Sequence, residues 1–290
     1  MILQTLIKRA DNLTHKFKLH GRIVAILSHL SIKKYPMLSF KKFTIAFLTI
    51  TFFVFNQNTF AANVHSDSNE LSAPADLNEF FSNSNTFFGK YVSNGKVDYA
   101  LIGKQKAELV TLINMIEKAD VSKADKNTKT AFYLNAYNLL TINSVVMNMP
   151  IKSPLDVKGF FDAKPHNIAG NMITLNDIEN KFLRPDPRVH FALVCAAIGC
   201  PKLMSEAYMP DKVQTQLINQ TKKAMNDASF IKVDASAKTV AISQLFDWYK
   251  DDFVNNTGTV INFINKFRST PIPADYTVTF YNYDWNLNIK

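Results

Sequence analysis

The sequence predicts an α+β fold, in which a single domain contains a buried central helix, short hairpins and a small, mostly antiparallel sheet. Most periodic apolar segments have helical spacing, and residues 128–149 are apolar almost all the way round, as in a helix inside a core. The extended pieces are short, lie beside turn residues and show no strand–helix–strand rhythm. A length of 290 residues with 47% hydrophobic and 20% charged side chains suits one domain or at most two small ones, and excludes a collagen-like, disulfide-dense or wholly disordered chain.

The individual elements follow from residue spacing and from start and stop signals. Phenylalanines recur at helical spacing in residues 77–92, Pro150 ends the buried helix, and residues 174–177 form a capping box. Helices are expected at residues 77–92, 101–119, 128–149, 174–183, 210–227 and 259–267, and around Trp248 and Tyr249 after a capping Ser243. Extended segments are expected at residues 97–99, in hairpins at 167–173 and 230–242, in a buried strand at 189–194 and in a closing strand at 276–283.

The positive charge of the chain is concentrated near its N-terminus. Of the 33 basic and 24 acidic residues, nine and one lie in residues 1–61, so 24 and 23 remain in residues 62–290. The remainder is close to neutral, so the excess basic charge that a phosphate backbone would attract belongs to the N-terminal leader. We therefore expect no nucleic-acid partner.

The N-terminal pattern predicts export. Lys41 and Lys42 precede 13 residues, 43–55, that are all apolar or threonine, and small residues follow at Ala61 and Ala62. This is the pattern of a secretory signal peptide, and the run is shorter than the roughly 20 residues of a membrane-spanning helix. We expect a signal peptide over residues 37–61, and the alternative is an uncleaved anchor, which would be the protein's one contact with a membrane.

The signal peptide divides the chain into four parts. Because Met37 stands just before the lysine pair, residues 1–36 are either an over-extended gene start or a basic tail. Residues 62–76 are a polar approach segment, and residues 77–290 are the single globular domain. The mature protein is accordingly expected in the periplasm or outside the cell.

Several kinds of chemistry have no motif in this chain. Neither a glycine-rich nucleotide-binding loop nor an H-E-x-x-H zinc motif nor a G-x-S-x-G nucleophile motif is present, and there are only 8 glycines. Outside residues 1–61 the only histidines are His65, His166 and His190. We expect no cofactor and no metal.

Residues 177–201 are the densest source of reactive groups, because both cysteines lie there. In an exported protein, Cys195 and Cys200 could form a disulfide if the segment between them is a loop. In the other interpretation, Cys195 is a nucleophile, His190 its base, and Glu179 or Asn135 the group that orients the base. Positions 190 and 195 face opposite sides of a regular strand, so this pair requires the strand to bend or end, and His166 is the alternative base.

Each of these residues also has a structural interpretation. His190 could be a core histidine hydrogen-bonded to a carboxylate such as Glu179. Asp177 and Glu179 could be capping or solvated residues with Arg184 as their ion-pair partner. Asn135 and its helical neighbour Asn138 need partners inside an apolar helix. They could tie down a neighbouring backbone or supply an orienting or oxyanion-stabilising amide.

Three segments, taken in order along the chain, resemble the domain-of-unknown-function 547 family. They are residues 132–138 (FYLNAYN), 174–184 (TLNDIENKFLR) and 186–201 (DPRVHFALVCAAIGCP). The family is largely uncharacterised, its bacterial members are often exported, and its His-and-Cys motif implies, by analogy, a papain-like or transglutaminase-like thiol enzyme. This chain has Asn180 where the family commonly has His after the Glu, so a base at that position would be missing here.

Two functional hypotheses remain. The first is an exported thiol hydrolase or acyl transferase that acts on a cell-envelope amide, such as a peptide or a peptidoglycan crosslink, through Cys195, His190, and Glu179 or Asn135. The second is a non-catalytic envelope binding or scaffold protein in which a Cys195–Cys200 disulfide holds a loop. The first predicts a free thiol of low pKa beside an imidazole in a cleft, and the second predicts an oxidised pair and a His190 buried away from any pocket.

Overall fold

The computed structural model describes residues 76–255 and 257–290, all of which belong to one unit of the chain. The predicted signal peptide, the residues before it and nearly all of the approach segment fall outside the described residues. Within the described part, none of the helices combines the length and the apolar character needed to cross a membrane.

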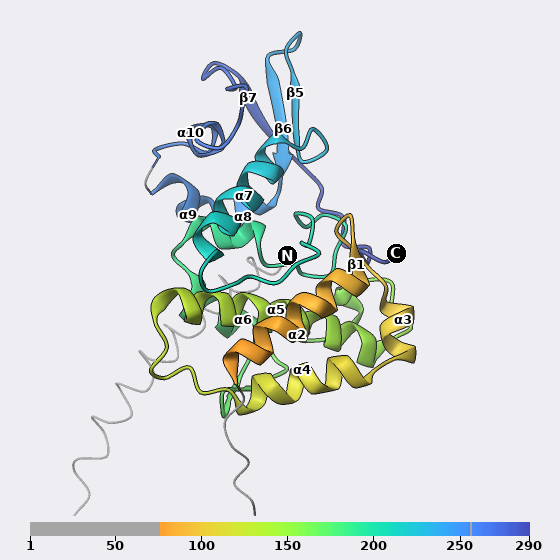
Figure 1. Cartoon of the computed structure of the whole chain (residues 1–290). Coiled ribbons are helices and arrows are strands. Elements are labelled where there is room, and N and C mark those ends of the chain that lie inside the picture. The colour runs from red at the N-terminus through yellow and green to blue at the C-terminus, as the bar shows by residue number, and fades with distance from the viewer. Residues whose placement is uncertain (1–75, 256) are drawn as a thin grey trace, which may run out of the picture. The chain divides into compact units, whose positions relative to one another are not determined.

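Three long helices form one side of the unit (Figure 1). They are α2 (Leu77–Tyr91), α4 (Ala107–Lys118) and α5 (Lys126–Asn148), and the short helix α3 (Tyr99–Lys104) precedes α4. All residues from 131 to 142 of α5 are buried, which confirms the predicted central helix. The predicted helix 101–119 is instead divided between α3 and α4, because the turn at Gln105 follows Gly103, a residue that weakens a helix.

The opposite side contains a three-stranded sheet with its own hydrophobic core. Strand β5 (Ile231–Asp234) pairs antiparallel with β6 (Thr239–Ser243), and β7 (Thr277–Tyr281) pairs parallel with β6. Between β6 and β7 the chain forms α8 (Leu245–Trp248), α9 (Lys250–Val254) and α10 (Val260–Asn265). Fully or almost fully buried aromatic rings dominate this second core, namely Phe191, Phe246, Phe253 and Phe263.

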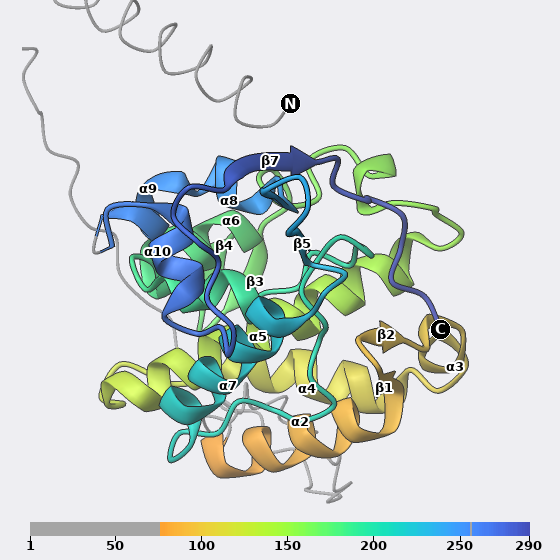
Figure 2. The ribbon, with the colours of Figure 1, turned by 90° about the horizontal axis from the view of Figure 1, so that it is seen from above.

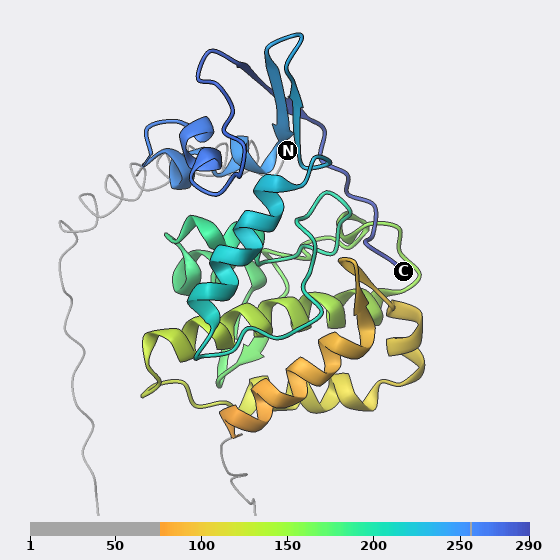
Figure 3. The same cartoon turned by 45° about the horizontal axis from the view of Figure 1, so that its top comes forward.

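Short hairpins and one longer helix complete the unit. The hairpins are β1 (Val92–Ser93) with β2 (Lys96–Val97), and β3 (His166–Ile168) with β4 (Asn171–Ile173). Helix α7 (Val213–Asn226) lies between the long helices and the sheet (Figure 3). Mixed helices and small, mostly antiparallel sheets confirm the predicted α+β class.

The predicted buried strand at residues 189–194 is wrong. Pro187–Phe191 is a 3₁₀ helix, in which Asp186 caps the first turn by accepting the N–H of Arg188 at 3.0 Å. The apolar run is too short to distinguish a strand from a buried helical turn by its periodicity, and the Asp-Pro pair at its start is a helix signal. Just before it, α6 (Leu175–Asp177) continues into a π-helical turn, Ile178–Leu183, after the predicted capping box at Thr174.

The C-terminal segment returns from the sheet to the first hairpin (Figure 2). Ile289 forms a parallel bridge with Val97, and Leu287 forms an antiparallel bridge with Ala197 in the loop between the two cysteines. The segment therefore links the first hairpin to the predicted reactive loop.

Candidate functional site

The two cysteines are joined in a disulfide. Cys195 and Cys200 have Cα atoms 6.5 Å apart, within the range that a disulfide spans. Ala196 has φ +59°, which turns the chain directly after Cys195. The segment between the cysteines is thus a loop, as the disulfide interpretation requires.

The C-terminal segment fixes this loop from outside. The N–H groups of Ile198 and Gly199 each donate to its carbonyls, those of Asn286 and Asp284, at 2.8 Å. A Cβ at position 199 would lie 2.9 Å from the Asp284 nitrogen and 2.9 Å from Tyr283 Cδ1, so this contact requires a glycine.

A buried tyrosine contacts both sulfur atoms. The Tyr283 hydroxyl donates to Cys200 Sγ at 3.0 Å and lies 3.1 Å from Cys195 Sγ. The backbone N–H of Cys195 also donates to Cys200 Sγ, at 3.1 Å. Burial raises the pKa of Tyr283 far above its ordinary value, so its phenol keeps its proton.

Two carboxylates lie beside His190. Its Nε2 lies 2.7 Å from Asp252 Oδ2, and its Nδ1 lies 3.7 Å from Glu179 Oε1. The ring stacks on Tyr249 with centroids 4.0 Å apart, and His190 is only 4% exposed. His190 is thus a core histidine whose hydrogen-bonded carboxylate is Asp252, while Glu179 lies beyond hydrogen-bond distance.

Arg184 completes this buried cluster. Its Nε and Nη2 donate to the two oxygens of Asp252 at 2.7 and 2.8 Å. Burial acts to raise the pKa of Asp252, but hydrogen bonds from His190 and Arg184 outweigh it and hold the pKa at about 2. The alternative in which Arg184 pairs with Asp177 or Glu179 is wrong. Arg184 forms a bidentate ion pair with Asp252, and Asp177 pairs with Lys181 at 2.9 Å.

Glu179 occupies an apolar and aromatic environment. It is 8% exposed, and its Oε1 has no hydrogen-bond partner among the described residues. Burial, and then the nearby Glu179 charge, raises the pKa of both Tyr137 and Tyr249. Asn180, the position of the family's histidine, accepts a hydrogen bond from Arg184 Nη1 at 2.6 Å.

The two asparagines of α5 bind backbone groups through both the nitrogen and the oxygen of their side-chain amides. Asn135 donates to the Tyr208 carbonyl at 2.8 Å and accepts the Tyr208 N–H at 2.9 Å. Asn138 donates to the Ala192 carbonyl at 3.0 Å and accepts the Val194 N–H at 2.9 Å. Asn138 therefore fixes the chain immediately before Cys195.

The other predicted base lies in the hairpin packed against α4. His166 begins β3 opposite Ile173, and its Nε2 is buried without a hydrogen-bond partner in the described part of the chain. Burial, with Lys164 as a second cause, lowers its pKa. No hydrogen bond within residues 76–255 and 257–290 joins His166 or His190 to either sulfur.

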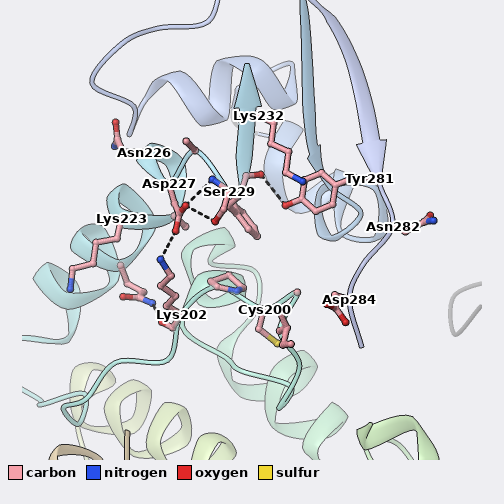
Figure 4. Close-up of a pocket in the computed structure, with 17 residues that line it drawn as sticks. Cys200, Lys202, Lys223, Asn226, Asp227, Ser229, Lys232, Tyr281, Asn282 and Asp284 are labelled. Carbon is pink, nitrogen blue, oxygen red and sulfur yellow. Dashed lines mark hydrogen bonds and ion pairs between the residues drawn. The ribbon is translucent and has the colours of Figure 1, made fainter. Parts of the chain in front are cut away.

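A pocket of about 730 Å³ opens beside the disulfide (Figure 4). Cys200 lies in its wall, next to a group in which Lys202 binds Asp227 at 2.8 Å and Asp227 accepts from Ser229. Across the pocket, Lys232 Nζ lies 4.2 Å from the centre of the Tyr281 ring. The lining also includes Lys223 and Asp284, so it combines both signs of charge with an aromatic surface.

A second pocket, of about 190 Å³, has Asp252, Arg188 and Lys266 in its lining. His190 lines neither of these two pockets. Among residues 76–255 and 257–290, no three His, Cys, Asp or Glu side chains are grouped so that they could hold a metal ion.

The comparison with known families supports the resemblance seen in the motifs. Residues 121–223 match the family model described as "Protein of unknown function, DUF547". This stretch resembles the DUF547 family. No curated protein and no solved structure matches the chain. The DUF547 stretch contains Asn135, Glu179, His190 and both cysteines, but it ends before Asp252 and Tyr283.

Asp252 and Tyr283 are the residues of the site that sequence reasoning missed. They lie 62 residues after His190 and 88 residues after Cys195, respectively. The only local signal is that Asp252 lies three residues after Tyr249, near the predicted helix that contains Trp248 and Tyr249. Nothing in the sequence near Tyr283 distinguishes it from the other tyrosines.

Proposed function

We propose that the protein is exported and acts as a non-catalytic binding protein of the cell envelope, with its ligand in the pocket beside the Cys195–Cys200 disulfide. One observation carries this proposal. The sulfur of Cys195 is bonded to Cys200, while His190 is held by Asp252 and lies near Glu179, so neither the predicted nucleophile nor the predicted base is available to the other.

Export is supported by two independent features. Residues 37–61 have the charge and hydrophobicity pattern of a signal peptide. The paired cysteines fit an oxidising compartment, because disulfides seldom persist in the reducing cytosol.

The character of the pocket favours a short peptide that carries both amino and carboxylate groups. Lys223 offers a cation to a carboxylate, Asp284 offers an anion to an amine, and Tyr281 offers an apolar face. Peptides of the cell envelope, including the stem peptides of peptidoglycan, have this mixed charge. Lys202 and Asp227 would orient such a ligand through hydrogen bonds with the polar atoms that their ion pair leaves free.

Export and oxidation are tested together in the full chain expressed in a bacterial host. Cell fractionation followed by intact-mass measurement without reductant should give a periplasmic or secreted protein lacking residues 1–61 and containing no alkylatable thiol. A full-length cytosolic protein with two free thiols would contradict the proposal.

Binding is tested by calorimetry with soluble peptidoglycan fragments. Lys223→Glu should weaken binding at least about tenfold, because it places a carboxylate where the ligand carboxylate would bind. Lys238→Glu is the matched control, since Lys238 is also exposed but pairs with Asp275 away from the pocket. Equal affinities for wild type and Lys223→Glu would exclude this pocket as the binding site.

The same fragments distinguish binding from thiol chemistry. The non-catalytic proposal predicts that reduced wild-type protein and Cys195→Ala both leave the fragments uncleaved in a chromatographic assay. Cleavage by reduced wild type but not by Cys195→Ala would replace the binding proposal with the thiol hydrolase.

A further inference from the structure

The two sulfurs of the disulfide have unequal surroundings. Cys200 Sγ accepts two hydrogen bonds, from the Cys195 N–H at 3.1 Å and from the Tyr283 hydroxyl at 3.0 Å. Cys195 Sγ has the Tyr283 oxygen at 3.1 Å and no backbone donor within the described residues. A phenol has one proton, so when Tyr283 donates to Cys200, its oxygen can only accept from Cys195, and it can do so only once reduction has given Cys195 an S–H.

This arrangement decides which sulfur carries the negative charge after reduction. Hydrogen bonds donated to a thiolate stabilise it and lower the pKa of the thiol. The reduced pair can form a chain in which the Cys195 S–H donates to the Tyr283 oxygen and the Tyr283 O–H donates to Cys200 S⁻. Because burial keeps Tyr283 protonated, this donor is present throughout the physiological pH range.

Leaving-group quality gives the two cysteines opposite roles. As a residue, Cys195 is more exposed than Cys200, which is 8% exposed but lies in the wall of the pocket. In thiol–disulfide exchange, the sulfur of lower thiol pKa leaves faster. The sulfur that accepts the two hydrogen bonds, that of Cys200, is therefore the one to leave, and the sulfur of Cys195 is the one attacked.

We propose that Cys195–Cys200 is a thiol–disulfide exchange site for a dithiol reductant, with Cys195 as the attacked sulfur and Cys200 as the leaving sulfur. A thiolate of the dithiol forms a bond to Cys195 Sγ, the Cys195–Cys200 bond breaks, and its electron pair goes to Cys200 Sγ. The second thiolate of the dithiol then attacks the mixed disulfide, so that the dithiol leaves oxidised. Cys195 leaves as a thiolate, takes a proton from water and becomes the thiol that donates to Tyr283.

This inference goes beyond ligand binding and does not depend on it, although the two share a wall of the pocket. The new thiolate at Cys200 would add a negative charge beside Lys202 and Asp227. Exchange is measured on the sulfurs themselves, so a pocket that binds no peptide would leave the inference intact.

The first test is the pH dependence of alkylation by iodoacetamide in single-cysteine variants of the full chain. Cys195→Ser leaves Cys200 and keeps the N–H of residue 195, while Cys200→Ser leaves Cys195. The midpoint of the rate profile should lie at lower pH for Cys200 than for Cys195, and this midpoint is independent of how accessible each sulfur is. Tyr283→Phe added to Cys195→Ser should raise the Cys200 midpoint.

Tyr91→Phe is the matched control, because Tyr91 is as buried as Tyr283, its hydroxyl donates to Gln105, and it lies outside the pocket. In the oxidised proteins, Tyr283→Phe should slow reduction by dithiothreitol about threefold for each pH unit by which it raises the Cys200 midpoint, because a thiol of higher pKa is a poorer leaving group. Tyr91→Phe should leave the rate unchanged. Circular dichroism of each variant checks that it is folded.

The second test needs no variant. Oxidised wild-type protein is mixed with glutathione, the freed thiol is trapped with iodoacetamide, and the adducts are mapped by mass spectrometry. Glutathione should be found on Cys195 and the alkyl group on Cys200. The reverse distribution, a Cys200 midpoint at or above that of Cys195, or a disulfide that dithiothreitol reduces only in denaturant would overturn the inference.

Discussion

Single side chains decide how the buried polar groups of this protein are stabilised. Asp252 is the clearest case, because it satisfies His190 and Arg184 at once and has 8% of its side chain exposed. An isolated carboxylate in such a place would be costly, whereas one with charge-assisted hydrogen bonds on both oxygens is stable. The cluster therefore depends on Asp252 more than on any of its partners.

Asp252→Asn should lower the free energy of unfolding at pH 7 by about 3 kcal/mol, because it leaves Arg184 without its carboxylate. Asp251→Asn is the control, since Asp251 is the exposed neighbour, and a change below about 0.5 kcal/mol is expected. Urea titrations monitored by circular dichroism give both values. Equal losses in the two variants would contradict the role assigned to Asp252.

The pH dependence of stability gives a second test of the same carboxylate. The pKa of Asp252 falls from an ordinary value of 3.8 to about 2 in the folded protein, so its contribution is present above pH 4. Because a depressed folded pKa means that the unfolded state takes up the proton first, this contribution, about 2 kcal/mol, is lost as the pH falls from about 4 through 2. The difference in stability between wild type and Asp252→Asn should shrink by that amount over this range.

Asn138→Ala should destabilise the protein by about 3 kcal/mol, because it leaves the Ala192 carbonyl and the Val194 N–H buried without partners. Asn143→Ala on the same helix is the control. Asn143 is half-buried, no hydrogen bond of its side chain is among the described contacts, and alanine suits a helix better than asparagine. Hydrogen exchange should also become faster in residues 192–200 of the Asn138 variant alone.

Sequence reasoning identified the chemical types present at the site but not their partners. It selected Glu179, His190 and Cys195 because they are concentrated in one segment, and it anticipated that His190 could be a core residue bound to a carboxylate. It could not find Asp252 or Tyr283, because Asp252 lies 62 residues from His190 and Tyr283 lies 88 residues from Cys195 in the sequence. Such pairings depend on tertiary packing, in which Tyr283 belongs to the larger core and Asp252 lies next to Phe253 of the second core, and no local pattern encodes it.

At the scale of elements, local signals placed most helices and hairpins. The capping box at Thr174, the caps at Asp76 and Asp125 and the stop before Pro150 all act within a few residues, so they can be read from the sequence. The 3₁₀ helix at Pro187–Phe191 was mistaken for a strand, because its apolar run is too short to show a helical period, although the Asp-Pro pair before it is a helix signal. The parallel pairing of β6 with β7 depends on a crossover of three helices, and it too could not be predicted locally.

The loop between the cysteines offers a test of packing between elements. Gly199→Ala should destabilise the protein by about 1–3 kcal/mol, because the new methyl group would overlap the backbone of Asp284 and the ring of Tyr283. Gly103→Ala is the matched substitution. It lies in α3 with nothing within 4 Å of its added Cβ, so it should stabilise by about 0.5–1 kcal/mol. Thermal unfolding of both variants should therefore shift in opposite directions.

At the scale of the whole described unit, the C-terminal segment connects parts that are distant in the sequence. Asn288 accepts the Tyr99 hydroxyl at 2.7 Å and donates to the Gly95 carbonyl at 3.1 Å. Leu287 is 5% exposed and bridges to Ala197, which lies in the disulfide loop. The segment therefore couples the first hairpin to the loop that forms the wall of the pocket.

Removing residues 287–290 should loosen both ends of this connection at once. The truncated chain loses a buried leucine and the bridges at Val97 and Ala197, so unfolding should become easier by more than about 3 kcal/mol. Hydrogen exchange should accelerate in residues 92–97 and 195–200 while the core of α5 keeps its protection. Lys290→Ala, which keeps the backbone, should change neither region.

Tyr99→Phe tests the same connection if the truncated chain does not fold. It removes only the hydrogen bond to Asn288 and leaves that amide oxygen buried, which should cost about 1–2 kcal/mol. Because Asn288 also donates its backbone N–H to the Ala196 carbonyl, the disturbance should reach the cysteine loop and not stop at the hairpin. Faster exchange confined to residues 92–99 in this variant would mean that the hairpin and the loop are stabilised independently.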